Sequence, residues 1–240
     1  MSVFRTAVIA ALVLLTTIGT AYSADVISLP SADTWIDSDS SGTRYGAAST
    51  LLMGRDQSNA LAMFQFDFTQ PIFAGFSGSA VSSAKLYFFN DGQRRIPDAN
   101  ITITPFACRY AWNESTVSYD WVYMIGGNSI SGFVDSSTAG QGTVHLADIA
   151  AVPFKSVVSI DITAIVQKWA DGSLVNNGLM LMPEGGFGSQ FAWTKEATGS
   201  DEVYRPYIEV NYSTAPEPGA GIALLTGLVG LVGVVRRRAK

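Results

Sequence analysis

One segment, residues 60–68, constrains the fold of this chain more than any other, because aromatic residues recur there at every second position. Successive side chains of a β-strand point to opposite faces, so a two-residue period predicts a strand. One face would carry Ala62, Phe64, Phe66 and Phe68, and the other Leu61, Met63, Gln65 and Asp67. A face with three phenylalanines has to be covered by a second sheet, which indicates two packed sheets.

The chain between about residues 25 and 212 is typical of strands throughout. Short apolar runs are separated by Gly, Ser, Thr, Asn and Asp, and long helical periodicity is absent. The expected strands are residues 33–37, 50–53, 60–68, 83–90, 100–104, 157–162, 178–182, 190–194 and 205–212. These strands predict an all-β fold, a two-sheet antiparallel β-sandwich that is jelly-roll-like. Residues 126–142 are expected to form a long Gly/Ser-rich loop.

One short helix is predicted after Asp161, whose carboxylate can cap it, and Asp171-Gly172 is expected to end it. Its apolar face would comprise Ile162, Ile165, Val166 and Trp169.

The N-terminus has the composition of a secretory signal peptide. Arg5 precedes an apolar run over residues 7–18, and Ala21-Tyr22-Ser23 offers small residues where signal peptidase reads them. We therefore expect signal peptidase to cut between Ser23 and Ala24, which makes residues 1–23 a signal peptide and the protein an exported one.

The C-terminus combines three features in a fixed order. Pro216-Glu217-Pro218 is stiff and extended, residues 219–235 carry no charge and are about long enough to cross a membrane, and a basic cluster follows. That cluster is Arg236, Arg237, Arg238 and Lys240, which should stay on the cytoplasmic side. The order predicts a C-terminal transmembrane helix within residues 214–240.

This C-terminal order resembles the PEP-CTERM sorting signal of Gram-negative bacteria. The resemblance implies recognition by an exosortase, which cuts near Pro216-Glu217-Pro218, in a bacterium that makes exopolysaccharide. An ordinary membrane anchor that is never cut is the alternative, since the glycines of residues 219–235 could serve helix packing instead.

Charge and cysteine content exclude several functions for the predicted domain, residues 24–213. Outside the two terminal segments, 10 basic and 19 acidic residues remain, so the net charge is −9. Nucleic acid is therefore excluded as a partner, and an anionic polymer is a poor default ligand unless divalent cations bridge the two. Cys108 is the single cysteine, so no internal disulfide can form. We expect Cys108 to be buried at a strand end, with an intermolecular disulfide as the alternative.

An ordered set of motifs between residues 25 and 212 resembles DNRLRE domains, also called carbohydrate-binding module family 96. The motifs include Asp33-Thr34-Trp35-Ile36-Asp37, Phe64-Gln65-Phe66-Asp67-Phe68, Trp112-Asn113-Glu114-Ser115-Thr116-Val117, Val166-Gln167-Lys168-Trp169 and Arg205-Pro206-Tyr207-Ile208-Glu209-Val210. The resemblance implies a β-sandwich that binds polysaccharide without cutting it. Some members bind alginate or accompany polysaccharide lyases.

The residues that carry enzyme chemistry are sparse. His145 is the single histidine, no nucleophile elbow lies near it, and zinc sites of His and Cys are excluded by count. We expect His145 on a surface or a strand. Paired carboxylates could still serve a glycoside hydrolase, and the candidates are Asp33, Asp37, Asp67, Glu114 and Asp161. Asp37-Ser38-Asp39 resembles the start of a calcium loop, but the missing distal acid breaks the EF-hand pattern. No cofactor is therefore assigned, and a structural calcium elsewhere in the sandwich is the alternative.

Aromatic rings beside polar groups are the residues most typical of sugar binding, because ring faces stack on the apolar face of a pyranose. The candidate rings are Trp35, Tyr45, Trp112, Trp121, Tyr123 and Trp193. Trp112 and Trp121 belong to the framework motif, so we expect them to pack internally. The predicted carbohydrate-binding residues are Arg44 and Tyr45 in a polar loop, Arg94 and Arg95 in the loop after residue 90, and Trp193 near a strand end.

The sequence thus predicts an exported, non-catalytic polysaccharide-binding protein of the cell surface or exopolysaccharide matrix. It would be membrane-anchored until an exosortase processes it. A structural matrix protein without a specific ligand is the first alternative, and a polysaccharide lyase or glycoside hydrolase is the second.

Overall fold

The computed structural model describes residues 22–55, 59–95, 101–138, 142–145, 148, 153–186 and 188–214. The predicted sorting motif, the predicted span over residues 219–235 and nearly all of the predicted signal peptide lie outside these residues. Within the described part of the chain, no helix is long and apolar enough to cross a membrane.

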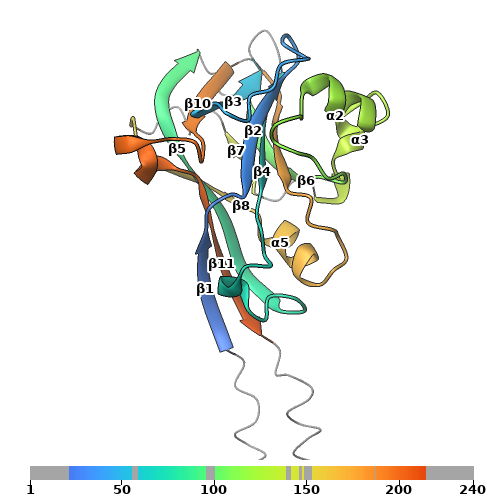
Figure 1. Cartoon of the computed structure of the whole chain (residues 1–240), viewed down its shortest axis with the longest axis vertical. Coiled ribbons are helices and arrows are strands. Elements are labelled where there is room, and N and C mark those ends of the chain that lie inside the picture. Colours follow the sequence, from blue (N-terminus) through green and yellow to red (C-terminus); the bar gives the residue numbers. More distant parts are fainter. Residues whose placement is uncertain are drawn as a thin grey trace, which may run out of the picture.

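The fold is mostly β, with antiparallel strands in a curled sheet, which is consistent with the predicted β-sandwich (Figure 1). The strands are β1 (Tyr22–Ser28), β2 (Ala32–Asp37), β3 (Thr50–Arg55), β4 (Asn59–Gln65), β5 (Ala80–Arg95), β6 (Thr102–Ala107), β7 (Val144–His145), β8 (Val157–Asp161), β9 (Leu179–Glu184), β10 (Gly188–Trp193) and β11 (Tyr207–Thr214). The strands β1 and β7 were not predicted. His145 is exposed on β7, as expected.

The long strand β5 joins the two halves of the architecture. Its first part pairs with β11 and β8, and together with β1 these form sheet A. Its last part pairs with β10, which continues through β3, β4, β9, β6 and β7 to form sheet B, with β2 added beside β4. The prediction that Arg94 and Arg95 lie in a loop was wrong, because both belong to β5 and pair with Gln190 and Ser189 of β10.

The main core contains the aromatic face that the sequence predicted. Ala62, Phe64 and Phe66 are buried there with Leu86 and Val210. The opposite face of β4 is buried as well, in a second cluster that includes Leu61 and Met63. The alternation of burial is therefore confirmed, and each of the two faces contributes to a different core. The strand is shorter than predicted, because β4 ends at Gln65 and not at Phe68.

Helices missed in the sequence cover the second cluster. The helices α2 (Tyr119–Ile125) and α3 (Ile130–Phe133) bury Val122 and Phe133 in it, beside β2 and β6 (Figure 1). The prediction of a single helix was therefore wrong, and so was the loop predicted over residues 126–142. That stretch also contains the 3-10 helix η2 (Ser136–Thr138). Burial of a few apolar side chains stabilises these short helices, because isolated helices of this length are marginal.

The predicted helix is present as α5 (Thr163–Ala170), and it buries Ile165, Val166 and Trp169 in the main core. Ile162 occupies the N-cap position, so Asp161 lies one residue before the cap. Its carboxylate still accepts a hydrogen bond from the N–H of Thr163, the first residue of the helix, at 2.8 Å. The chain leaves the helix through Gly172, whose φ of 73° suits a residue without a Cβ.

Cys108 follows β6 directly and is fully buried, as predicted. Burial raises the pKa of its thiol well above the ordinary value, because the thiolate would lose its hydration. We therefore expect Cys108 to react with a thiol reagent only after denaturation, which Ellman's titration of the full-length chain in buffer and in guanidinium chloride can measure. Rapid labelling in buffer, or a disulfide-linked dimer on a non-reducing gel, would contradict this.

The two ends of the described chain lie side by side, because β1 and β11 are antiparallel and Tyr22 pairs with Thr214. The predicted signal-peptidase site falls inside β1, and a cut there would leave Ala24–Ser28 paired with β11. The first and last residues of the described chain therefore lie at one end of sheet A.

Candidate functional site

The outward face of sheet A carries a band of aromatic side chains. Along β5, Leu86 and Phe88 point into the core, while Tyr87 and Phe89 are half-buried on the other face. Tyr207 of β11 pairs directly with Tyr87. Exposed residues of β8 continue this face. The period of two thus places rings from neighbouring strands on one solvent-facing surface.

The three rings of this band and three further rings form one chain of contacts. We call these six rings the aromatic row: Tyr87, Tyr207, Phe89, Tyr204, Trp193 and Phe154. The Tyr87 and Tyr207 rings are stacked, with centroids 4.7 Å apart and planes at 13°. Tyr204 belongs to the 3-10 helix η3 (Gly199–Tyr204), and its ring lies 5.6 Å from Phe89 and 5.2 Å from Trp193. Phe154 ends the row, 5.7 Å from Trp193, and is 59% exposed.

Lys155 fixes one end of the aromatic row. Its Nζ lies 4.5 Å from the Tyr204 ring centre and 5.2 Å from that of Phe154, and it forms an ion pair with Asp201 at 3.0 Å. Its backbone has a φ of 66°, which is uncommon for a residue with a Cβ, and its N–H donates to the Asn90 carbonyl. Cation–π contact and the ion pair therefore hold these rings in one arrangement.

Polar groups flank the aromatic row on sheet A. Ser159 of β8 lies opposite Tyr87, and Lys85 lies between Glu209 and Asp161 on the neighbouring strands. Burial, followed by the negative charge of Glu209, raises the pKa of the Tyr87 and Tyr207 hydroxyls, so both remain protonated donors. A sugar ring on this surface would meet aromatic faces together with hydroxyl and carboxylate partners.

A separate hollow of about 610 Å³ lies beside α5. Phe68, Phe76 and Trp169 form its apolar floor, and Gln65 and Asn176 contribute to its polar rim. The Phe68 and Phe76 rings are stacked at 4.4 Å, and the buried Trp169 Nε1 has no hydrogen-bond partner among the described residues. This hollow is a second surface on which a sugar could stack.

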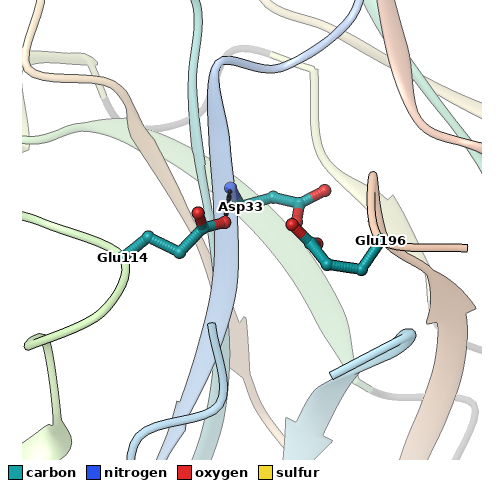
Figure 2. Close-up of side chains that lie close together, drawn as sticks. All are labelled: Asp33, Glu114 and Glu196. Atoms are coloured by element: carbon teal, nitrogen blue, oxygen red, sulfur yellow. Dashed lines mark hydrogen bonds between the residues drawn. The ribbon is translucent and has the colours of Figure 1, made fainter. Parts of the chain in front are cut away.

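Three carboxylates also converge beside β2. Figure 2 shows Asp33 of β2 between Glu114, which precedes α2, and Glu196, which follows β10. One oxygen from each lies within 4.8 Å of the others. Glu114 accepts the Asp33 N–H at 2.8 Å, and Asp33 accepts the Lys195 N–H at 2.8 Å.

The charges of this cluster are unbalanced, because three carboxyl groups share one ammonium among the described residues, that of Lys195. Its Nζ lies 2.9 Å from Glu114 and also contacts Glu196. Burial raises the pKa of Asp33 to about 8, the hydrogen bond from Lys195 N–H opposes this, and the negative charge of Glu196 adds to it. Near neutral pH, Asp33 therefore needs either a proton or a nearby cation.

The predicted binding residues lie in three places. Trp193 is 7% exposed and belongs to the aromatic row, so it supports neighbouring rings more than it offers its own face. Tyr45 stacks on Trp35 at 3.7 Å, and Arg44 beside it is exposed. Arg94 and Arg95 pair with the start of β10, whereas Trp193 is the last residue of that strand.

Sequence reasoning missed most members of the aromatic row. The alternation of residues 83–90 placed Tyr87 and Phe89 on one face, and that signal could have identified them as surface rings. Tyr204 and Phe154 are remote in sequence from both residues, and no motif connects them. Glu196 was likewise absent from the predicted carboxylates, although Asp33 and Glu114 were among them.

Comparison with known proteins is consistent with a carbohydrate-related surface. Residues 24–132 match the model of carbohydrate-binding module family 96. The match begins within β1 and ends within α3. It includes Tyr87 and Phe89 of the aromatic row and Asp33 and Glu114 of the carboxylate cluster. No curated protein matches the chain. The family match supports carbohydrate binding, and a module of this kind is non-catalytic in itself.

Proposed function

We propose that this chain is an exported, non-catalytic polysaccharide-binding protein and that the aromatic row is its binding surface. The observation that carries the proposal is the continuous contact of six rings, which runs from the outward face of sheet A to the exposed Phe154. Pyranose rings stack on such faces, and prearranged side chains lose little conformational entropy on binding. The family match over residues 24–132 supports the ligand class.

The charge of the domain restricts the polysaccharide. The net charge of −9 outside the terminal segments repels a polyanion. Next to the aromatic row, Lys155 is already paired with Asp201. We therefore expect an uncharged glycan, or an anionic one that divalent cations bridge to the protein.

Export and sorting are part of the same proposal. A signal peptide over residues 1–23 and an exosortase signal over residues 214–240 would deliver the domain to the cell surface or the exopolysaccharide matrix. Tyr207 begins β11 and Thr214 ends it, a separation of about 23 Å at the rise of an extended strand. A domain tethered beyond Thr214 would therefore present Tyr207 and Tyr87 away from the membrane.

Truncating one ring should weaken polysaccharide binding. We expect the Tyr207→Ala variant of the full-length chain to lose roughly tenfold in affinity, about 1.4 kcal/mol, because a stacking face is removed. The measurement is affinity electrophoresis through gels that contain neutral or anionic polysaccharides, including the extracellular polysaccharide of the native host.

Two further variants make this test specific. Phe154→Ala removes an exposed ring of the row at little cost to the fold, and it should weaken binding too. Tyr110→Ala removes an exposed ring that packs near Phe133, outside the row, and it should bind as the parent does. No retention of the parent chain by any gel would refute polysaccharide binding and favour a structural matrix protein. Weaker binding in Phe68→Ala alone would move the site to the hollow.

The remaining elements of the proposal are tested in cells and with purified protein. The mature protein should begin at Ala24, end before Gly219 and be found outside the membrane fraction. Retention of residues 236–240 in the membrane fraction would mean an uncut anchor. Polysaccharide incubated with the full-length chain should release no reducing or unsaturated ends, and their release would indicate a hydrolase or a lyase.

A further inference from the structure

The carboxylate cluster of Asp33, Glu114 and Glu196 is separate from the aromatic row and has a geometry suited to a cation. One oxygen of each side chain lies within 4.8 Å of the other two (Figure 2). Two oxygens on opposite sides of a calcium ion are about 4.6–5.2 Å apart, because Ca²⁺–O distances are about 2.3–2.6 Å. All three oxygens can therefore reach one such ion with small side-chain adjustments.

Unpartnered oxygens provide an independent reason to expect a ligand. Asp33 is 0% exposed, and its Oδ1 is buried without a hydrogen-bond partner among the described residues. Glu196 Oε2 is in the same situation. In Figure 2 the Asp33 carboxyl points toward that of Glu196. A buried carboxylate oxygen without a donor is costly, so either a proton shared by the Asp33 and Glu196 carboxyls or a cation between them must offset this cost.

The donor set selects the kind of ion. Three carboxylates face one ammonium, that of Lys195, which contacts Glu114 and Glu196. Carboxylate oxygens suit hard cations, and water can complete the coordination because the Glu114 and Glu196 side chains are 23% and 25% exposed. Calcium tolerates irregular coordination, whereas magnesium demands a near-ideal octahedron. We propose that Asp33, Glu114 and Glu196 form a calcium site.

A calcium ion at this place would join three parts of the chain that are distant in sequence. Asp33 lies on β2, Glu114 lies in the segment before α2, and Glu196 lies in the turn after β10. Hydrogen bonds already connect Asp33 to the other two segments. The ion stabilises this junction, and its role is independent of whether the aromatic row binds polysaccharide.

The test is calcium binding by the purified full-length chain after treatment with a chelator. Calorimetric titration with Ca²⁺ should show one site, and thermal unfolding should shift upward by about 5–10 °C when Ca²⁺ is at 100 times its Kd. The Glu196→Gln variant should lose both effects, and so should Glu114→Gln if the first variant does not fold. The matched control is Glu184→Gln, which changes an exposed carboxylate outside the cluster and should keep both effects.

Three outcomes would overturn the proposal. The parent chain could show neither heat of binding nor a change in Tm with Ca²⁺. Glu196→Gln could bind calcium as Glu184→Gln does, which would place the ion elsewhere. Magnesium could bind as tightly as calcium, which would refute the assignment of the ion.

Discussion

Replacing Phe64 by alanine is expected to lower the free energy of unfolding by about 3–5 kcal/mol, the range for removing a buried phenylalanine side chain. Phe64 is 0% exposed and lies in the main core. Its strand β4 is central to sheet B: Phe64 pairs with Asp33 of β2 on one side and with Leu179 of β9 on the other. Paired strands on both sides limit how far the structure can collapse into the cavity.

Urea denaturation of the full-length chain measures this loss. The control is Phe154→Ala, which truncates the same residue type at a position that is 59% exposed and should change stability by about 0.5 kcal/mol at most. A loss in Phe64→Ala no larger than in this control would show that β4 does not occupy the centre of the core.

Replacing Lys195 by methionine is expected to lower the free energy of unfolding by about 1.5–3 kcal/mol in the presence of a chelator, the contribution of hydrogen bonds to charged groups, because the half-buried Glu114 and Glu196 lose the ammonium that they contact. The ammonium contacts both Glu114 and Glu196, and its removal leaves three carboxylates facing one another. Calcium should restore much of this stability, because it supplies positive charge to the same three carboxylates.

Chemical denaturation of the Lys195→Met variant, with chelator and with Ca²⁺, measures both effects. Lys85→Met is the matched control: Lys85 is exposed on sheet A between Glu209 and Asp161, and exposed ion pairs contribute about 0–1 kcal/mol. Equal losses in the two variants would contradict the special position of Lys195. A loss that calcium does not reduce would weigh against the calcium site.

Periodicity predicted the strands of this fold well, because a period of two is set by the backbone and by burial of one face. The alternation around Phe64 and Leu86 survives in the structure with its faces correctly assigned. The helices α2 and α3 were missed because each is too short to show a helical period. Tertiary burial of Val122 and Phe133 stabilises them, and local sequence does not encode that contact.

Prediction of the site was weaker, since sites depend on contacts between remote segments. Asp91-Gly92 looked like a turn, so Arg94 and Arg95 were placed in a loop, whereas β5 continues because β10 pairs with it. Trp193 was predicted to bind carbohydrate; it lies in the aromatic row, where it is 7% exposed, and its partners Tyr204 and Phe154 come from other elements. Likewise, Asp33 and Glu114 were named among the candidate paired carboxylates. Their neighbours Glu196 and Lys195 are distant in sequence from both, and only the fold brings them together.

The most direct test of the central claim is to locate a bound oligosaccharide on the protein. The measurement is NMR of the full-length chain, titrated with an oligosaccharide from a polysaccharide that it retains. We predict that resonances of Tyr87, Tyr204, Tyr207 and Phe154 shift together and saturate with one Kd. Shifts confined to the hollow at Phe68 and Trp169, or to the loop of Arg44 and Tyr45, would contradict binding on the aromatic row.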